Sequence, residues 1–327
     1  MHLARRFALP WMGAALAMIL QHLETRDLIA SRTLKWFAGL IALGVIAAVV
    51  EQCKDPAFVD RLINVPAPVL LAVAISACLV FVGTVQRYLH CRFSEQDFVK
   101  HNEVGGFIVA LVGTLYAVVL GFLTVVTWQH FSDARQLVSQ EASAAADTWH
   151  TAVGLPPTRR ARIREDVLDY SKLMVDSEWA RMRSGAFDRH GDVIVMDALS
   201  AAEAFAPSNW EQANAQSATV GQLVIVHDIR QRRLSDNSSG LSPFEWLVLA
   251  IGAFCVIGFC WLFGLSNKRI HLLMTSAVTI VTVSTLVLLF ELQYPFRSSI
   301  GISSADWSAA LGHIQLMQSG AQMDMRM

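Results

Sequence analysis

The sequence predicts an all-α, polytopic membrane protein with four core transmembrane helices, extra helices at the N-terminus and an inserted helical domain outside the membrane. Three observations predict this class. Hydrophobic residues make up 54% of the 327-residue chain, and charged residues make up only 16%, against about 25% in an average soluble domain. The apolar residues gather in long runs. A polar segment with helical periodicity separates the second core run from the third.

Two apolar stretches precede the core, within residues 1–60. Residues 7–20 follow Arg5 and Arg6 as the apolar part of a signal sequence would. No small-residue cleavage site follows promptly, so we expect an embedded or interfacial helix there. Residues 35–50 form a short run, which is marginal for crossing the bilayer and also fits a tilted or interfacial helix.

The four core spans are the longest apolar runs, and they form two pairs, 68–128 and 244–291. The runs cover residues 68–86, 105–128, 244–265 and 270–291. Residues 105–128 carry no charged side chain, and a helix rising 1.5 Å per residue over this length crosses about 30 Å of hydrocarbon. Residues 292–327 are expected to form a C-terminal tail.

The 105–128 helix has one face of small residues. They recur at helical spacing as Gly106, Ala110, Gly113, Ala117 and Gly121, with hydroxyls at Thr114, Thr124 and Thr127. Such a face lets another helix approach closely, and it also leaves room for a narrow pathway. Helix packing and pore lining both stay open, and an oligomer can use both.

The last span carries a stripe of threonines. Thr275, Thr279, Thr282 and Thr285 are spaced to share one helix face. Their hydroxyls suit a polar path, but threonines in membrane helices also bond the carbonyl four residues earlier. Both interpretations stay open.

His101, Asn102 and Glu103 form a polar motif at the start of the second span. An ionisable pair at this boundary suits binding of an ion, sensing of pH or gating of a vestibule. The alternative is a helix start in which Asn102 caps the helix and Glu103 interacts favourably with the helix dipole.

Residues 129–243 predict an extramembrane domain that is helical throughout. Its first helix continues directly from the membrane and stops at Gly154-Leu155-Pro156-Pro157. Thr158 is expected to cap the second helix, and further helices are expected over 192–205 and over 209–234, the latter with Ser208 as its cap.

We expect four side chains to make contacts within this domain, namely Glu141, Tyr170, Glu178 and Trp179. Glu141 suits pairing with an arginine from a neighbouring helix. The basic run 159–164 is expected to be a solvated helix face compensated by acids, such as Arg162 with Asp166, or to meet anionic lipid headgroups. The helices alone make a modest core, so packing against the membrane part or against other subunits is expected.

The composition excludes several functions. A net charge of −1 argues against nucleic acid as a partner, because phosphate binding needs a basic field. The ten histidines and five cysteines show no metal-ligand spacing, and Cys78, Cys255 and Cys260 suit buried thiols. No nucleophile motif or phosphate loop is present, so we expect no enzyme, no metal and no cofactor.

The second span and its surroundings resemble a bacterial family called bestrophin-like, over about residues 68–305. The resemblance rests on the run 101–107 (HNEVGGF), followed by Tyr116, Gly121-Phe122, Trp128, Ala134, Glu141-Ala142, Gly154-Leu155-Pro156, Tyr170, Glu178-Trp179, Phe263-Gly264 and Pro295-Phe296. The first 60 residues depart from the family pattern. So does Tyr294, where members commonly have an arginine.

The resemblance extends more distantly to true bestrophins, which are pentameric anion channels whose inserted domain is cytoplasmic. It implies a homo-oligomer, with a pentamer as the candidate state, in the lipid bilayer of the bacterial inner membrane. The oligomer is expected to conduct small inorganic anions such as chloride along the 105–128 helix. The loop charges mildly favour the opposite orientation, with the two short loops in the cytoplasm. The alternative function is a non-conducting, membrane-anchored interaction or sensory protein that acts through its helical domain.

Overall fold

The computed structural model describes residues 56–92, 99, 102–237 and 240–324. Within these ranges every regular element is a helix, which confirms the all-α class. The apolar stretches 7–20 and 35–50 lie outside the described residues. The chain divides into two compact units, one holding residues 1–56 and 243–251 and the other holding the rest. The contacts given below lie within the larger unit.

Four helices are long and apolar enough to cross a membrane, which makes the chain a multi-pass membrane protein. They are α4 (Ala67–Arg92), α6 (Asn102–Thr151), α11 (Pro243–Trp261) and α12 (Lys268–Leu292). A short helix, α3 (Pro56–Ile63), precedes them. The expected third span, 244–265, is longer than α11, because the chain turns at Leu262, whose N–H bonds to the Phe259 carbonyl three residues earlier.

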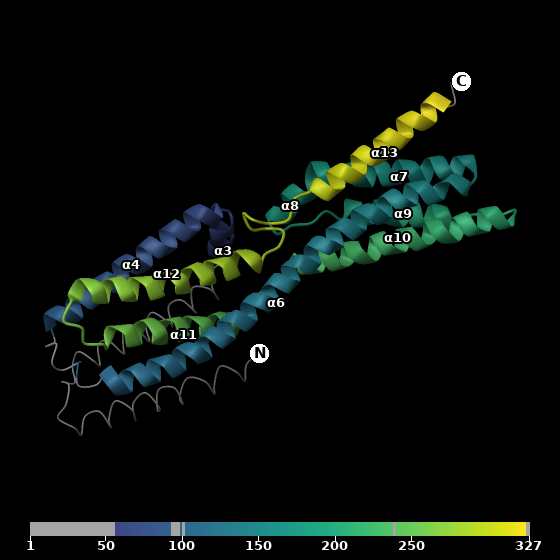
Figure 1. Cartoon of the computed structure of the whole chain (residues 1–327). Coiled ribbons are helices and arrows are strands. Elements are labelled where there is room, and N and C mark those ends of the chain that lie inside the picture. The colour runs from purple at the N-terminus through teal and green to yellow at the C-terminus, as the bar shows by residue number, and fades with distance from the viewer. Residues whose placement is uncertain (1–55, 93–98, 100–101, 238–239, 325–327) are drawn as a thin grey trace, which may run out of the picture. The chain divides into compact units, whose positions relative to one another are not determined.

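The helix α6 has 50 residues and no break (Figure 1). At 1.5 Å per residue it is about 75 Å long, more than twice the hydrocarbon thickness, so its C-terminal part must lie outside the membrane. The helix tightens into the 3₁₀ turn η1 (Ala152–Gly154) before Pro156, as the break signal predicts. The same helix therefore belongs to both the membrane part and the domain.

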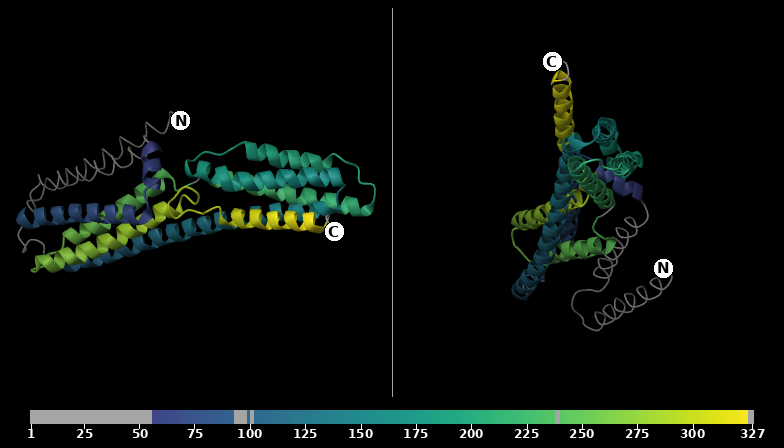
Figure 2. Two further views of the ribbon diagram at one scale, coloured as in Figure 1. Left: turned by 90° about the horizontal axis from the view of Figure 1, so that it is seen from above. Right: turned by 90° about the vertical axis from the view of Figure 1, so that its right-hand side faces the viewer.

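Seven further elements complete the described chain. They are α7 (Pro157–Leu173), the π-helix η2 (Met174–Glu178), α8 (Trp179–Arg183), α9 (His190–Glu203), α10 (Trp210–Asp236) and α13 (Ala305–Asp324), besides η1. In the domain α10 packs along α6 and α9 packs on α7, and Figure 2 shows these helices side by side. Their shared core includes Val138, Ile163, Val167 and Leu223.

The segment expected to be a C-terminal tail is part of the domain. Its helix α13 packs against α6 and α7. Trp307 and Ile314 are fully buried in the core cluster, and the Trp307 ring meets the Tyr170 ring edge to face at 5.3 Å. Trp307 and Ile314 are the only aromatic residue and the only isoleucine of α13, so the periodic hydrophobic pattern of this segment is weak. The sequence therefore did not predict this packing.

Two predicted helix caps are wrong. Thr158 lies inside α7, because Pro157 occupies its first position, where the missing N–H and the fixed φ of proline suit a helix start. Ser208 is not the cap of α10. Asn209 has the extended cap conformation, and its side chain accepts the Gln212 N–H at 2.8 Å, while Ser208 bonds the Gln212 side chain.

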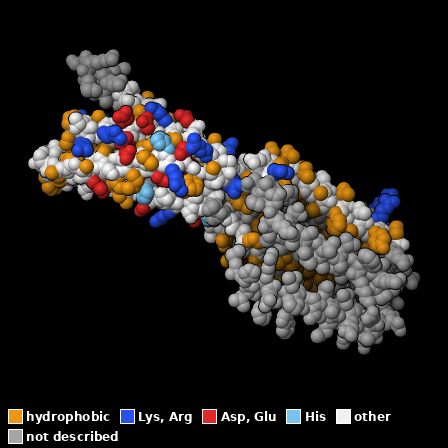
Figure 3. All heavy atoms as spheres, turned by 180° about the vertical axis from the view of Figure 1, so that it is seen from behind, with side chains coloured by type: hydrophobic (Ala, Val, Ile, Leu, Met, Phe, Trp, Pro, Cys, Tyr) orange, Lys and Arg blue, Asp and Glu red, His pale blue; other side chains and the backbone are white. Residues whose placement is uncertain are grey.

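The surface of the two parts differs in kind. In the space-filling view, charged side chains gather over the domain, and apolar side chains dominate the visible surface of the membrane helices (Figure 3). Arg162 pairs with Asp166 at 3.1 Å, as its spacing predicts. The thiols of Cys78, Cys255 and Cys260 are free and partly buried.

Candidate functional site

The small-residue face of α6 has two different environments. At its start, Gly105 and Gly106 face Phe263, whose ring lies 3.9 Å from where a Cβ would stand. Farther along, a Cβ on Gly113 or Gly121 would meet nothing within 4 Å. Ala110 and Ala117 are also exposed. The middle of this face therefore has no partner among the residues that the structure describes.

The hydroxyls of α6 are already bonded. Thr114, Thr124 and Thr127 donate to the carbonyls of Ala110, Leu120 and Leu123, four residues earlier, at 2.7–2.8 Å. These bonds satisfy the hydroxyls inside their own helix.

The threonine stripe of α12 is buried. Thr275, Thr279 and Thr282 lie on the side of α12 that is covered, and α4 is the helix that packs most closely on α12. Thr275 and Thr279 donate to the carbonyls of His271 and Thr275. Thr285 is half-buried and donates to the Val281 carbonyl. Within one subunit the stripe therefore faces a helix interface.

At the start of α6, Asn102 ties the helix to the loop between α11 and α12. Its amide donates to the Gly264 carbonyl at 2.8 Å and accepts the Gly264 N–H at 2.9 Å. An asparagine suits position 102, because its side-chain amide can both donate a hydrogen bond to the Gly264 backbone and accept one from it. Glu103 is exposed, and His101 lies outside the described residues.

A buried ionic network lies where α6 enters the domain. Glu141 on α6 and Arg233 on α10 are both 0% exposed, and their closest atoms, Oε2 and Nε, are 2.6 Å apart. Tyr170 on α7 donates its phenolic O–H to Glu141 Oε1 at 2.5 Å. Burial, and then the charge of Glu141, raise the pKa of Tyr170 far above its usual range, so the phenol keeps the proton that it donates.

Glu178 and Arg230 extend the network and are also fully buried. Glu178 Oε1 lies 3.1 Å from Arg230 Nη1 and 3.9 Å from Arg233 Nη1, although neither contact has hydrogen-bond geometry. Arg230 also pairs with Asp192 at 2.7 Å. Two buried carboxylates thus face two buried guanidinium groups, so their charges compensate.

Aromatic rings close the network. Trp179 lies under Arg233, with 5.3 Å from the guanidinium carbon to the ring centre, and donates its indole N–H to the Ile302 carbonyl at 2.9 Å. Tyr170 lies under Arg230 at 5.6 Å. The four expected domain-contact residues therefore meet at one place.

The arginines of this network are absent from the sequence-based candidates. The signal was present, because Arg230 and Arg233 continue the helical spacing of the buried residues Leu223 and Val226. Charged residues at core-facing positions of a helix indicate a buried ion pair. The wider turn of η2, which ends at Glu178, brings that carboxylate to the same place, and a π-turn has no clear sequence signature.

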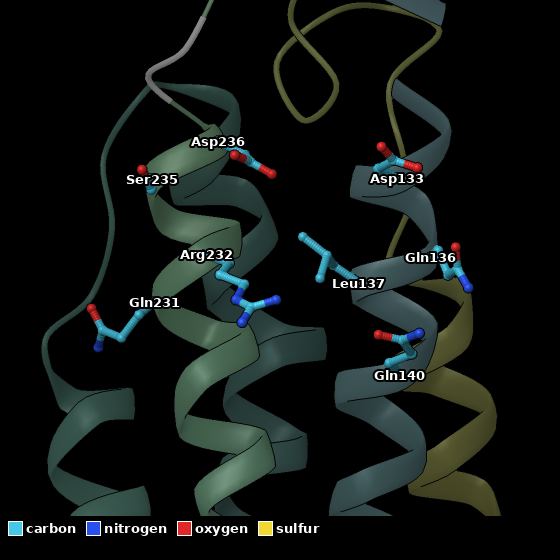
Figure 4. Close-up of a pocket in the computed structure, with 8 residues that line it drawn as sticks. All are labelled: Asp133, Gln136, Leu137, Gln140, Gln231, Arg232, Ser235 and Asp236. Carbon is cyan, nitrogen blue, oxygen red and sulfur yellow. The ribbon is translucent and has the colours of Figure 1, made fainter. Parts of the chain in front are cut away.

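A groove of about 560 Å³, lined mainly by polar side chains, lies between α6 and α10 (Figure 4). Its lining residues are Asp133, Gln136, Leu137, Gln140, Gln231, Arg232, Ser235 and Asp236. Arg232 and Leu137 point toward one another across it. Within the described ranges, no three His, Cys, Asp or Glu side chains are grouped to hold a metal ion.

Comparison with known families assigns this architecture. Residues 70–306 match the model of the bestrophin-like domain, which is most of the chain. The chain belongs to the bestrophin-like family. The match covers α6, the buried network and the groove, and it ends at the start of α13. A comparison with curated proteins finds no match.

Solved structures support the same fold. A bestrophin homolog from Klebsiella pneumoniae, solved by zinc phasing, is 15% identical with a TM-score of 0.50, covering 75% of this chain and 94% of that chain. A point variant of that homolog is 13% identical to this chain with a TM-score of 0.52, and the match covers 75% of this chain and 96% of that chain. A variant of a membrane protein is 13% identical to this chain with a TM-score of 0.58, and the match covers 76% of this chain and 98% of that chain. At this identity the likeness concerns the fold.

Proposed function

We propose that this bestrophin-like protein is a homo-oligomeric ion channel with α6 nearest the axis. The observation that carries the proposal is α6 itself. It is one uninterrupted helix that belongs to both the membrane part and the domain, and its membrane half has a wide face that the described part of the chain leaves exposed. A helix at the axis of a ring has this combination of length and free surface.

The open part of the small-residue face supports assembly. Small side chains offer lipid tails little surface for van der Waals contact, whereas another helix can approach closely at Gly113, Ala117 and Gly121. We therefore assign this face to contacts between copies of the chain. Ring closure then brings the α6 helices of all subunits around one axis.

The resemblance to true bestrophins supports small anions, such as chloride, as the permeant ions, and it favours a pentamer. It also favours the bacterial inner membrane, with the domain on the cytoplasmic side. A channel needs no catalytic residues, and we propose no enzymatic activity.

Two measurements test the proposal. The mass of the purified protein in detergent should correspond to a multiple of the 36.0 kDa chain, and liposomes containing it should release chloride down its gradient. A monomer would contradict the axis, because one chain has no central pathway. An oligomer that seals the bilayer at all voltages would favour the alternative, in which the domain binds a partner and the spans only anchor it.

A further inference from the structure

The uninterrupted course of α6 links each face inside the membrane to one face outside it. Residues seven apart in an α-helix drift by only about 20°, so they form lengthwise rows. Two such rows stay exposed from the membrane to the domain. They are Leu115, Phe122, Gln129, Gln136 and Ser143, and Val119, Val126, Asp133, Gln140 and Asp147.

The rows that start from the small-residue face become covered. Gly113 leads to Ala134 and Glu141, and Gly121 leads to Ala142 and Trp149, all four of which are buried in the domain. A continuous aqueous pathway along α6 therefore cannot follow the small-residue face into the domain. The two exposed rows stay uncovered along both parts of α6.

The chemistry of the exposed rows changes where α6 leaves its apolar segment. Up to Val126 their side chains are large and apolar. From Gln129 onward they are amides, a serine and two aspartates, which suit contact with water and with hydrated ions. The polar groove between α6 and α10 adjoins this part, and it shares Asp133, Gln136 and Gln140 with the rows.

Two opposite charges in the groove, Arg232 and Asp133, have no hydrogen-bond or ion-pair partner among residues 56–92, 102–237 and 240–324. Arg232 is exposed on α10, points between the two helices (Figure 4), and makes no hydrogen bond or ion pair with any described residue. Asp133 is exposed on α6 and has none with the described residues either. A charge that makes no direct ion pair acts on ions in the adjacent water.

We propose that the α6–α10 groove borders the ion pathway outside the membrane, and that Arg232 and Asp133 set the ion selectivity of the channel with opposite signs. In a ring each residue recurs in every subunit. Arg232 attracts anions and Asp133 opposes them. This inference rests on the proposed channel function.

Charge reversal tests the inference in planar bilayers under a salt gradient. Arg232→Glu should raise the cation-to-anion permeability ratio at least about fivefold, the factor that corresponds to about 1 kcal/mol, and Asp133→Lys should lower it by a similar factor. Arg232→Gln and Asp133→Asn should give smaller shifts in the same directions. These two neutral variants replace the charge-reversed variants in the test if the charge-reversed variants fail to assemble.

Matched controls make the same charge changes elsewhere on the domain. Arg183→Glu and Asp176→Lys alter exposed residues of α8 and η2 and should leave the ratio unchanged. If the wild-type protein conducts and the groove variants shift the ratio no more than these controls, the inference is overturned while the channel stands. If the wild-type protein conducts nothing, both proposals fail.

Discussion

The two halves of α6 differ in how much of their surface is buried, although they form one continuous helix. In the domain half, Ala134, Val138, Glu141 and Trp149 are buried by α7, α10 and α13. In the membrane half, side chains as large as Phe107 and Phe122 remain exposed within the chain. The domain half is covered by helices of its own chain, and we propose that lipid and other copies of the chain cover the membrane half. Substitutions in the two halves should therefore have different consequences.

The largest loss of subunit stability is expected from Glu141→Gln. It removes the negative charge opposite Arg233 and leaves a buried guanidinium uncompensated, which typically costs about 3–5 kcal/mol. The thermal unfolding midpoint of the protein in detergent should fall accordingly. Glu165→Gln, on the exposed side of α7, is the control. Equal midpoints for the two variants would mean that the ion pair does not stabilise the domain.

A smaller loss is expected from Gly191→Ala. Gly191 is buried in α9, and a Cβ there would lie 2.6 Å from the Arg230 guanidinium carbon, so the arginine must shift within the ionic network. Overpacking of this kind costs about 1–3 kcal/mol. Gly221→Ala in α10 meets nothing within 4 Å and should stabilise the helix by up to about 1 kcal/mol. Unfolding midpoints that shift in the same direction would contradict this expectation.

Asn102→Ala should have a local effect at the start of the membrane half. It removes both hydrogen bonds to Gly264, worth about 1–2 kcal/mol together. Hydrogen exchange of the amides in residues 262–267 should become faster, while exchange in α10 stays unchanged. Glu103→Gln, at the next and exposed position, should change neither. Protection of 262–267 that survives Asn102→Ala would show that other contacts hold this loop.

Gly113→Leu should change subunit stability least of all, because a Cβ there meets no atom of the described residues within 4 Å. Its effect should appear in assembly, since leucine on the small-residue face holds neighbouring helices apart. The mass in detergent should fall toward that of the single chain. Val118→Leu enlarges a residue of the exposed large apolar face and should leave the mass unchanged. An intact oligomer of Gly113→Leu would remove this face from the subunit contact.

Several features followed from the sequence because their signals are local. Long uncharged runs indicated the spans, and the Gly-Leu-Pro-Pro step indicated where α6 stops. Glu141 was expected to meet an arginine, but the sequence did not say which one, and Arg233 is 92 residues away. The cap at Asn209 was missed by one residue, since Ser208 is equally suited in type.

The sequence by itself determined that this is an all-helical membrane protein of the bestrophin-like family with a domain inserted between its spans, because hydropathy and helical period are properties of consecutive residues. Only the tertiary structure decided which faces of α6 are covered. Burial depends on α10 and α13, which are distant from α6 in the sequence and pack against it in the fold. No local sequence pattern in α6 predicts which of its faces they cover. Their packing buries the continuation of the small-residue face and leaves the row through Asp133 open to water.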